Sequence, residues 1–329
     1  MKPGGYSDSG ADIAYELSKN NLTVITPIEN PNIGNDRDWV FPDTKLGIKN
    51  AIKNGADIFW LNTVLYKDHP IESFFDKEIQ FVGQEPKLVD IYDDKFQTNK
   101  LLKSKSIPIP KNILIKKKDV KDTLCLMHFP SVVKPLRGRG SQGVSLVNNQ
   151  KELSQKLTGI FSHNEFGNSV YLEQYLSGQE ITITVMPNGN YTIKNQINHF
   201  DRPWCLPAVK RFNHQDGIAP YNGVVAVMEN STVLTDEELS SNKIQEVYSN
   251  CIKAAELIKI KAPIRIDCRA DKNGKYYLFD LNMKPNMTGP SRSHRKNQDS
   301  LTLMAARKIG WNYFDLLNNI LNQKWEAFG

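Results

Sequence analysis

The chain contains no long apolar run, no paired cysteines and no strong excess of one charge. In its 329 residues no apolar stretch approaches the length of about 20 residues that crosses a bilayer, so we expect no membrane contact. The N-terminal segment MKPGGYSDSG is polar from its first residues and does not resemble a signal peptide. The four cysteines stand far apart and form no CxxC pair, which argues against zinc sites and disulfide frameworks. Reduced thiols in a cytoplasmic protein are the expected outcome.

Charge is abundant but evenly spread. The 42 Lys and Arg residues outnumber the 36 Asp and Glu residues, for a formal net charge of +6. A nucleic-acid-binding protein usually concentrates its basic residues in a stripe with aromatic residues between them. The densest basic run here, Lys116–Lys118, is followed by Asp119 and indicates a solvated turn. We therefore expect small-molecule partners rather than nucleic acid, in a chain whose length suits two or three lobes.

Helical and strand patterns alternate in the first 92 residues. Apolar residues have helical spacing in Asp12–Lys19 and Leu46–Asn54, whereas Leu22–Ile28 and Asp57–Leu61 are short apolar runs typical of strands. This alternation predicts an open parallel sheet with helices on its faces. The segment GGYS is typical of the turn after a first strand, yet only three residues precede it. The sheet is therefore either one strand short, or its first strand lies outside this chain.

The rest of the chain changes character near Pro86–Tyr92 and predicts antiparallel strands mixed with helices. Consecutive X-Pro units exclude helix from Ile107–Pro110, and Asn188-Gly189 is a typical hairpin turn. The segment 199–223 contains three prolines and predicts a long loop, which in a compact domain usually serves function. The expected helices are Asp94–Lys105, Glu237–Ile258 and Thr302–Gln323, and the expected strands are Ser131–Lys134, Val144–Val147, Val170–Glu173, Ile181–Val185, Tyr191–Ile197, Pro263–Arg269 and Tyr276–Leu281.

A glycine-rich segment, KPLRGRGSQGV, lies between two predicted strands at 134–144. Its three glycines and serine make a turn whose backbone amides can point at one anion, and Lys134 supplies a point charge suited to phosphate. Arg137 and Arg139 add positive potential. A plain hairpin loop with basic residues is the alternative interpretation, because glycine-rich loops are common.

The segment YLEQYLSGQE, at 171–180, contains a strand that ends at Glu173, an apolar pair, a Ser-Gly turn and then Glu180. Backbone groups at such a strand end can pair with a purine edge while apolar side chains cover the ring. A carboxylate one turn away can accept hydrogen bonds from ribose hydroxyls. Two glutamates that bracket a turn are more often surface residues, which is the alternative.

Two short motifs, RID at 265–267 and FDLN at 279–282, lie on the last two predicted strands. Because side chains alternate along a strand, Arg265 shares a face with Asp267, and Asp280 shares a face with Asn282. If the strands pair, three oxygen-bearing side chains meet one arginine, and Mg²⁺ prefers such hard oxygen ligands. The alternative is an exposed hairpin face on which Arg265 pairs with Asp280. The many apolar neighbours argue against it, since a buried carboxylate without a cation is costly.

These segments occur in one order along the chain, together with Lys95, which begins a predicted helix and would by default be a surface lysine. DK at 94–95 is followed by VVKP at 132–135, the glycine-rich loop, LEQYLSGQE, RID, FDLNMKPNMT at 279–288 and MAARKIGW at 304–311. In this order the chain resembles the ATP-grasp superfamily, and most closely its D-alanine–D-alanine ligase-like branch, from about Lys95 to the C-terminus. The resemblance implies an α/β protein with an α+β ATP-grasp part: an N-terminal domain (1–92), a central lobe (93–177) and a C-terminal lobe (178–329), the two lobes clasping ATP.

By this resemblance the residues take defined roles in binding ATP and two Mg²⁺ ions, with Mn²⁺ as an alternative metal. Nucleotide contacts would come from Lys95, Lys134, Arg139, Gly140, Ser141, Gly143, Val144, Glu173, Gln174, Tyr175, Leu176, Glu180, Lys210 and Leu281. The metal ligands would be Asp267, Asp280 and Asn282, and the catalytic residues Arg265, Lys210 and Ser141. The implied activity joins a carboxylate to an amine through an acyl phosphate, and the implied assembly is a homodimer.

Departures from the pattern of the branch lie where substrate would bind. Ser9 stands where D-alanine ligases have a glutamate, and Asn286 replaces a glycine. The segment 289–300 is expanded and basic, so Arg292 either contacts an anionic group of a substrate or belongs to a solvated loop. These changes argue against D-alanine–D-alanine ligation and favour another small amino-acid-like or peptide substrate. Another ATP-grasp reaction, such as a carboxylation or a purine-pathway ligation, and a nucleotide-binding protein without catalysis are the alternatives.

Overall fold

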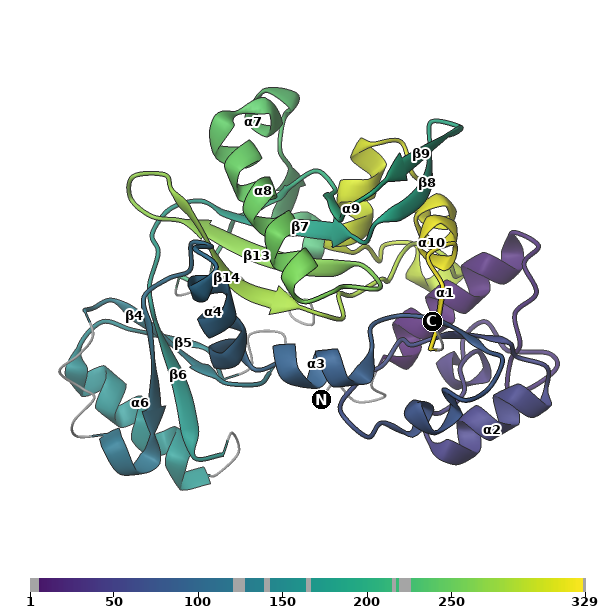
Figure 1. Cartoon of the computed structure of the whole chain (residues 1–329), viewed down its shortest axis with the longest axis horizontal. Helices are drawn as coiled ribbons and strands as arrows, with labels where there is room; N and C mark the ends of the chain where they lie inside the picture. The colour runs from purple at the N-terminus through teal and green to yellow at the C-terminus, as the bar shows by residue number, and fades with distance from the viewer. Residues whose placement is uncertain are drawn as a thin grey trace.

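The structure is a computed structural model of the chain and describes residues 6–120, 128–138, 143–163, 167–214, 217–218 and 226–327. Figure 1 shows a large sheet in the centre, a smaller sheet with helix α6 at the lower left, and the N-terminal elements at the lower right. Helix α4 (Lys95–Ser104) lies between the two sheets. In the part of the chain that is described, no helix is long and apolar enough to span a membrane.

The N-terminal elements surround a small three-stranded sheet. Strands β1 (Ile58–Trp60) and β2 (Gln80–Val82) are parallel, and β15 (Trp325–Glu326) pairs antiparallel with β2. The end of the chain therefore returns to the N-terminal elements (Figure 1), and the boundaries of the three predicted domains stay a prediction. The other elements here are α1 (Ser7–Lys19), η1 (Asp36–Asp38), α2 (Lys45–Lys53), η2 (Pro70–Phe74) and α3 (Pro86–Tyr92), of which η1 and η2 are 3-10 helices.

The strand predicted at Leu22–Ile28 is wrong, because these residues are irregular and belong to no sheet. Leu22 and Val24 instead pack against the apolar residues of α1. The Thr26 hydroxyl donates to the Ile28 carbonyl at 2.7 Å, which stabilises a bend. Apolar burial is thus satisfied by contact with a helix, and the periodicity of the sequence does not distinguish this from strand pairing.

The smaller sheet has four antiparallel strands in the order β3-β6-β4-β5. Helix α6 packs on it through a core that includes Ile115, Val133 and Leu153. The bounds are β3 (Asn112–Lys116), β4 (Ser131–Pro135), β5 (Ser145–Val147), α6 (Gln150–His163) and β6 (Ser169–Gln174), with the 3-10 helix η3 (Lys117–Asp119) after β3. The predicted strands at 131–134, 144–147 and 170–173 are confirmed to within one residue at each end.

The large sheet is antiparallel, with the order β12-β11-β7-β13-β14 and a short strand, β10, that also pairs with β7. Its strands are β7 (Glu180–Met186), β10 (Trp204–Cys205), β11 (Val209–Arg211), β12 (Ser231–Val233), β13 (Ile264–Ala270) and β14 (Tyr276–Asn282). The associated helices are α7 (Asp236–Ser240), α8 (Asn242–Leu257), α9 (Leu301–Lys308) and α10 (Tyr313–Leu321), with the 3-10 helices η4 (Val227–Glu229) and η5 (Ser293–Arg295).

Three predictions in this region need correction. The hairpin is not between 181–185 and 191–197: β8 (Gly189–Ile193) pairs with β9 (Gln196–Phe200), and positive φ angles at Lys194 and Asn195 form its two-residue turn. The predicted loop 199–223 contains β10 and β11 in its described part. The predicted helices 237–258 and 302–323 are each interrupted, at Ser241 with ψ 143° and at Gly310 with φ 94°.

The large sheet has one apolar face and one polar face. On β7 and β13 the apolar face carries Ile181, Ile183 and Ile266, which share a buried core with α8. Figure 1 shows α8 lying over this side of the sheet. Residues of the alternate positions leave the strands on the other side. This polar face includes Glu180, Thr182, Thr184, Arg211, Arg265, Asp267, Arg269, Asp280 and Asn282.

Candidate active site

Strands β13 and β14 place the two carboxylates of the polar face opposite each other. Asp267 pairs with Asp280 across the strands, and Arg265 pairs with Asn282 two positions away. All four side chains therefore leave the pair on the same side. The Arg265 guanidinium donates to both carboxylate oxygens of Asp267, at 3.2 and 3.1 Å, and the Thr182 hydroxyl donates to Asp267 at 2.7 Å. The alternative in which Arg265 pairs with Asp280 is thus wrong.

Lys95 reaches Asp280 from helix α4. Asp94 caps this helix by accepting from the backbone N–H of Gln97 at 2.9 Å, which fixes where the helix begins. The Lys95 ammonium lies 3.1 Å from the Asp280 carboxylate and donates to the Gly138 carbonyl at 3.3 Å. Its side chain is 13% exposed, so the default of a surface lysine does not hold. Burial opposes ionisation of Asp280, but Lys95 and Lys134 outweigh it and hold the pKa of this carboxyl below its ordinary value.

Lys134 and Glu173 form a buried ion pair between β4 and β6. The ammonium lies 2.6 Å from Glu173 Oε1 and 4.6 Å from the centre of the Phe279 ring. Phe279 is the extra residue of a β-bulge that follows the Asp267–Asp280 pair, which explains how its ring reaches the smaller sheet. Glu173 Oε2 is buried and has no hydrogen-bond partner among the described residues. Burial raises the pKa of Glu173 in spite of the contact with Lys134.

The residues after Glu173 lead from the smaller sheet to the large one. The backbone N–H groups of Gln174 and Tyr175 donate to the carbonyls of Lys111 and Pro130, at 2.8 and 3.2 Å, and Leu176 is buried. Glu180 then begins β7 and accepts from His214 at 2.9 Å. Burial opposes ionisation of Glu180, but His214 and Arg269 hold its pKa below the ordinary value.

Arg269 and His214 are partners that the sequence analysis missed. Arg269 lies 4.7 Å from the centre of the Tyr175 ring, donates to the Tyr175 hydroxyl at 3.0 Å, and lies 3.5 Å from Glu180. Arg269 thus links Tyr175 to Glu180 within the segment 171–180. Strand alternation could have placed Arg269 on the polar face, since it is two positions beyond Asp267. His214 lies in the predicted loop 199–223, where no periodicity marks it.

The donor set of the polar face fits Mg²⁺. In the described residues no three His, Cys, Asp or Glu side chains gather closely enough to hold a metal by themselves. Asp267, Asp280 and Asn282 contribute two carboxylates and one amide oxygen. Such a partial set of hard ligands suits an ion that obtains its other ligands from phosphate and water. Lys95 and Arg265 neutralise the two carboxylates in the structure described here.

Several predicted nucleotide residues are placed less closely to this cluster. Arg139, Gly140 and Ser141 lie outside the described residues, whereas Gly143, with φ 73°, and Val144 lead into β5. Leu281 is buried on the apolar side of β14. Lys210 pairs in register with Ile181, a residue of the apolar face, so its side chain leaves β11 on the side away from Asp267. The predicted roles of these residues stay predictions.

Arg292, one of the three predicted substrate residues, lies in a second cluster, the α1 clamp, formed by Asp8, Asp12, Thr288, Arg292 and Arg295. Arg292 is fully buried and donates to Asp12 at 3.0 Å, to the Asp8 carbonyl at 3.1 Å and to the Ile33 carbonyl at 3.2 Å; it also lies 2.7 Å from Asp36. The interpretation of a solvated loop is therefore wrong for Arg292. Its contact with a substrate stays a prediction, although acidic and carbonyl oxygens of the N-terminal elements already hold its guanidinium.

The other two predicted substrate residues have local partners. Ser9 is buried in α1, where its hydroxyl donates to the Tyr6 carbonyl and accepts from Asn62, both at 3.1 Å. Asn286 Oδ1 accepts from the backbone N–H of Thr288 at 3.1 Å. Asn62 therefore stabilises the start of α1 near the place where the resemblance predicts substrate.

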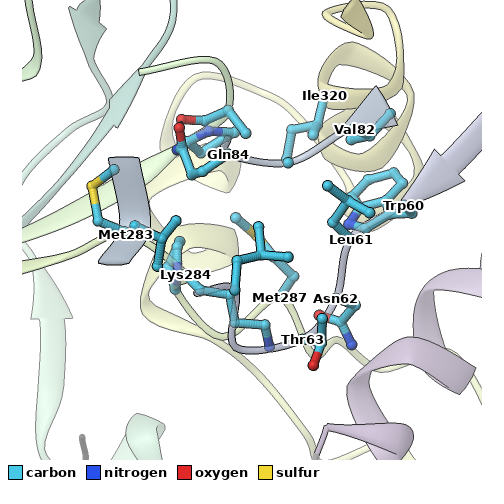
Figure 2. Close-up of a pocket in the computed structure, with 16 residues that line it drawn as sticks. Trp60, Leu61, Asn62, Thr63, Val82, Gln84, Met283, Lys284, Met287 and Ile320 are labelled. Carbon is cyan, nitrogen blue, oxygen red and sulfur yellow. The ribbon is translucent and has the colours of Figure 1, made fainter. Parts of the chain in front are cut away.

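A pocket begins directly after Asn282, between the N-terminal elements and the large sheet. It encloses about 460 Å³, including its open mouth. Figure 2 shows Trp60, Leu61 and Val82 on one side, with Met283 and Met287 facing them. Pro263, which precedes the β13 strand of Arg265, also lines it. The Lys284 ammonium lies 3.2 Å from the centre of the Tyr6 ring, so this lysine joins the pocket wall to the start of α1.

Comparisons with known proteins show which family this chain resembles. The D-alanine–D-alanine ligase of Aquifex aeolicus is 27% identical over 252 residues, which covers 74% of this chain and 73% of that protein. The D-alanine–D-alanine ligase of Buchnera aphidicola is 27% identical over 240 residues, 69% of this chain and 68% of that protein.

Solved structures show the same fold. A D-alanine–D-alanine ligase structure from Bacillus anthracis has a TM-score of 0.66 at 22% identity, covering 96% of this chain and 90% of that one. A structure of the ligase from the same organism complexed with ATP has a TM-score of 0.62 at 22% identity, covering 85% and 83%. The family model described as D-ala D-ala ligase C-terminus matches residues 101–322. Because this match spans most of the chain, the chain belongs to the D-alanine–D-alanine ligase family of ATP-grasp enzymes, which use ATP to form a C–N bond.

Proposed function

We propose that this protein joins the carboxylate of one small amino-acid-like substrate to the amine of another through an acyl phosphate, with release of ADP and phosphate. The observation that carries the proposal is the pairing of Asp267 with Asp280 on the polar face, where Arg265 and Lys95 lie against them. Two carboxylates that are each matched to a cation can exchange these partners for a metal-bound triphosphate. The buried Lys134 adds a positive charge from the smaller sheet.

In this mechanism the protein binds, neutralises and orients the reactants. Asp267, Asp280 and Asn282 would hold two Mg²⁺ ions, or Mn²⁺, which neutralise phosphate oxygens when bound. Lys95 and Lys134 would contact the phosphate chain, and the segment from Glu173 to Glu180 would hold the adenosine part. A substrate carboxylate attacks the γ-phosphorus and ADP leaves. An amine then attacks the carbonyl carbon of the acyl phosphate, and the C–O bond to phosphate breaks as phosphate leaves and the nitrogen loses a proton. Arg265 would stabilise the negative charge that develops in both steps.

The pocket after Asn282 supports a substrate with an apolar body. It begins where Arg265 and Asn282 end the polar face, so a reactant that extends from the metal site enters it. Its walls of Trp60, Leu61 and Met287 suit an apolar side chain larger than a methyl group. Ser9 and Asn286, together with this pocket, favour an amino acid or peptide other than D-alanine. The relatives named above are D-alanine–D-alanine ligases, and that substrate pair is the reference for the test.

A screen of amino acid pairs with ATP and Mg²⁺ tests the proposal. Phosphate release is measured first, and the products are identified by mass spectrometry. Stimulation by a pair with one bulky apolar member, above the rate with D-alanine alone, is the expected result. A protein that binds ATP but releases no phosphate with any carboxylate–amine pair would instead be a nucleotide-binding protein without catalysis. Retention of all four residues on β13 and β14 argues against that outcome.

The assembly and location predicted from the sequence remain part of the proposal. Cys205, Cys251 and Cys268 are free thiols, which is consistent with a cytoplasmic protein. A homodimer would be recognised by light scattering at the concentration used for the activity screen. Neither property enters the mechanism above.

A further inference from the structure

Arg211, at the end of β11, lies on the polar face of the large sheet. Its register partner on β7 is Glu180, whereas the preceding residue, Lys210, pairs with Ile181 of the apolar face. Glu180 in turn pairs with Arg269 on β13, and Thr182 pairs with Asp267. Since alternate residues share a face, Arg211 leaves its strand on the same side as Asp267, one strand away from Glu180.

The side chain of Arg211 is buried, and in the described part of the chain it forms no ion pair with an acidic residue. Arg211 is 7% exposed, and its Nε is buried without a hydrogen-bond partner. Within the residues that the structure describes, no carboxylate forms an ion pair with it, whereas Arg265 is paired with Asp267 and Arg269 lies near Glu180. Burying a cation without a partner costs free energy. Among the described residues, Arg211 is therefore a buried cation without an ion pair of its own, on the face that carries the metal ligands.

Two carboxylates of the polar face, Asp267 and Glu180, favour the charged form of Arg211. Burial lowers the pKa of Arg211; Asp267 opposes this effect, Arg265 adds to it, and Glu180 opposes it. Both carboxylates therefore act on the guanidinium electrostatically, although neither forms an ion pair with it among the described residues. The next 15 residues, 212–226, contain no lysine or arginine. Arg211 is therefore the last arginine or lysine in the sequence before the segment 212–226.

We propose that Arg211 binds the phosphate chain of the nucleotide, on the polar face that also carries Glu180 and Asp267. This proposal rests on the proposed function for the identity of the anion. A guanidinium can donate two hydrogen bonds to a phosphate, and the ligand supplies the negative charge that the protein omits. Arg211, rather than Lys210, is then the residue of β11 that contacts the nucleotide, and it acts alongside Arg265.

The substitution Arg211→Met tests this proposal with two readouts. The first is the change in melting temperature of the protein when Mg²⁺ with ADP, with adenosine or with inorganic tripolyphosphate is added. The second is the melting temperature without ligand. Arg202→Met is the matched control, because Arg202 is exposed and pairs with Glu256. We expect Arg211→Met to weaken the binding of ADP and of tripolyphosphate at least tenfold, and to leave the binding of adenosine unchanged.

The unliganded melting temperature separates ligand binding from a structural role. If Arg211 had a structural role, its removal would lower the melting temperature of the unliganded protein. If it is a buried cation without an ion-pair partner, its removal should leave that temperature unchanged or raise it. A large fall of that temperature, equal ADP binding by Arg211→Met and wild type, or loss of ADP binding in Lys210→Met but not in Arg211→Met would each overturn the proposal. If Arg211→Met does not fold, Arg211→Lys should still show weaker tripolyphosphate binding, and unchanged binding would overturn the proposal.

The tripolyphosphate measurement also distinguishes this inference from the proposed function. A wild-type protein that binds tripolyphosphate through Arg211 but forms no amide with any substrate pair would contradict the function and support the anion site. A wild-type protein that catalyses ligation while Arg211→Met binds ADP normally would support the proposed function and contradict the anion site. Absence of ADP and tripolyphosphate binding by the wild type would overturn both.

Discussion

The polar face and the α1 clamp both remove charges from water, but they satisfy them to different degrees. In the clamp, Asp12 is fully buried and its oxygens accept from Thr288, Ser291, Arg292 and Arg295. In and beside the polar face, Glu173 Oε2 and Arg211 Nε are buried without partners. The clamp fixes α1 to the segment 288–295. In the polar face and the neighbouring Lys134–Glu173 pair, one guanidinium nitrogen and one carboxylate oxygen thus lack hydrogen-bond partners among the described residues, as expected of a site that binds a charged ligand.

This difference predicts which substitutions affect activity and which affect folding. A buried network in which each member is matched stabilises one arrangement, and loss of one partner is costly because charges remain behind. Buried groups without partners lower the free energy of unfolding, and such residues are retained for chemistry. The four predictions below test this division, in order of decreasing effect.

The largest effect is expected from Asp267→Asn. This change removes a metal ligand while it keeps the shape of the side chain and the hydrogen bond from Thr182. We expect the rate of phosphate release to fall at least about a thousandfold, or roughly 4 kcal/mol in barrier height. Asp201→Asn is the control, since the Asp201 side chain is 94% exposed. Normal turnover by Asp267→Asn would mean that the metal ligands are assigned wrongly.

Asp12→Asn should act on the free energy of unfolding instead. It leaves Arg292 and Arg295 buried with less compensation, so we expect a loss of about 3 kcal/mol, measured by urea unfolding. ADP binding by the folded fraction should remain within twofold of wild type. A variant as stable as wild type but unable to bind ADP would place the clamp in the ligand site and remove the contrast between the two regions.

The two regions also differ in how far the sequence predicts them. Strand alternation suffices to put Asp267 on the face of Arg265, and the order of motifs suffices for the fold. The partner of Arg292 is not predictable in this way, because Asp12 is 280 residues away and no local pattern links them. A basic run without a visible acidic partner indicates a solvated loop, and the structure shows a buried clamp.

The register of strand pairing explains the remaining differences between the predictions and the structure. Lys210 and Arg211 are neighbours in the sequence, and only the pairing of β11 with β7 shows that Arg211 is on the polar face. The hairpin turn was predicted at Asn188-Gly189, but Lys194 and Asn195 form it, since two-residue turns compete locally and the pairing of β8 with β9 decides. Likewise, the contact of Lys95 with Asp280 requires α4 to pack against β14, which no spacing in the sequence implies.

A smaller effect, confined to acid, is expected at Asp280. Its pKa in the folded protein lies below the ordinary value of 3.8, because Lys95 and Lys134 outweigh the effect of burial. The ionised carboxylate therefore stabilises the fold above pH 3.8, and this contribution is lost as the pH falls through the folded pKa. The difference in unfolding free energy between wild type and Asp280→Asn should be constant near neutral pH and shrink below pH 3.8. A difference that grows in acid would have the wrong sign for this ion pair.

The smallest predicted effect concerns Thr182, whose hydroxyl donates to Asp267 and orients it. Thr182→Val removes a hydrogen bond to a charged acceptor, and we expect kcat/KM to fall about tenfold while the Mg²⁺ concentration for half-maximal rate rises. Thr182→Ser keeps the donor and should restore the rate. Thr184→Val is a matched control, because Thr184 lies on the same strand and face but contacts Thr302. Equal rates for Thr182→Val and Thr184→Val would show that Asp267 needs no orientation by Thr182, and that its direction is set by Arg265 alone.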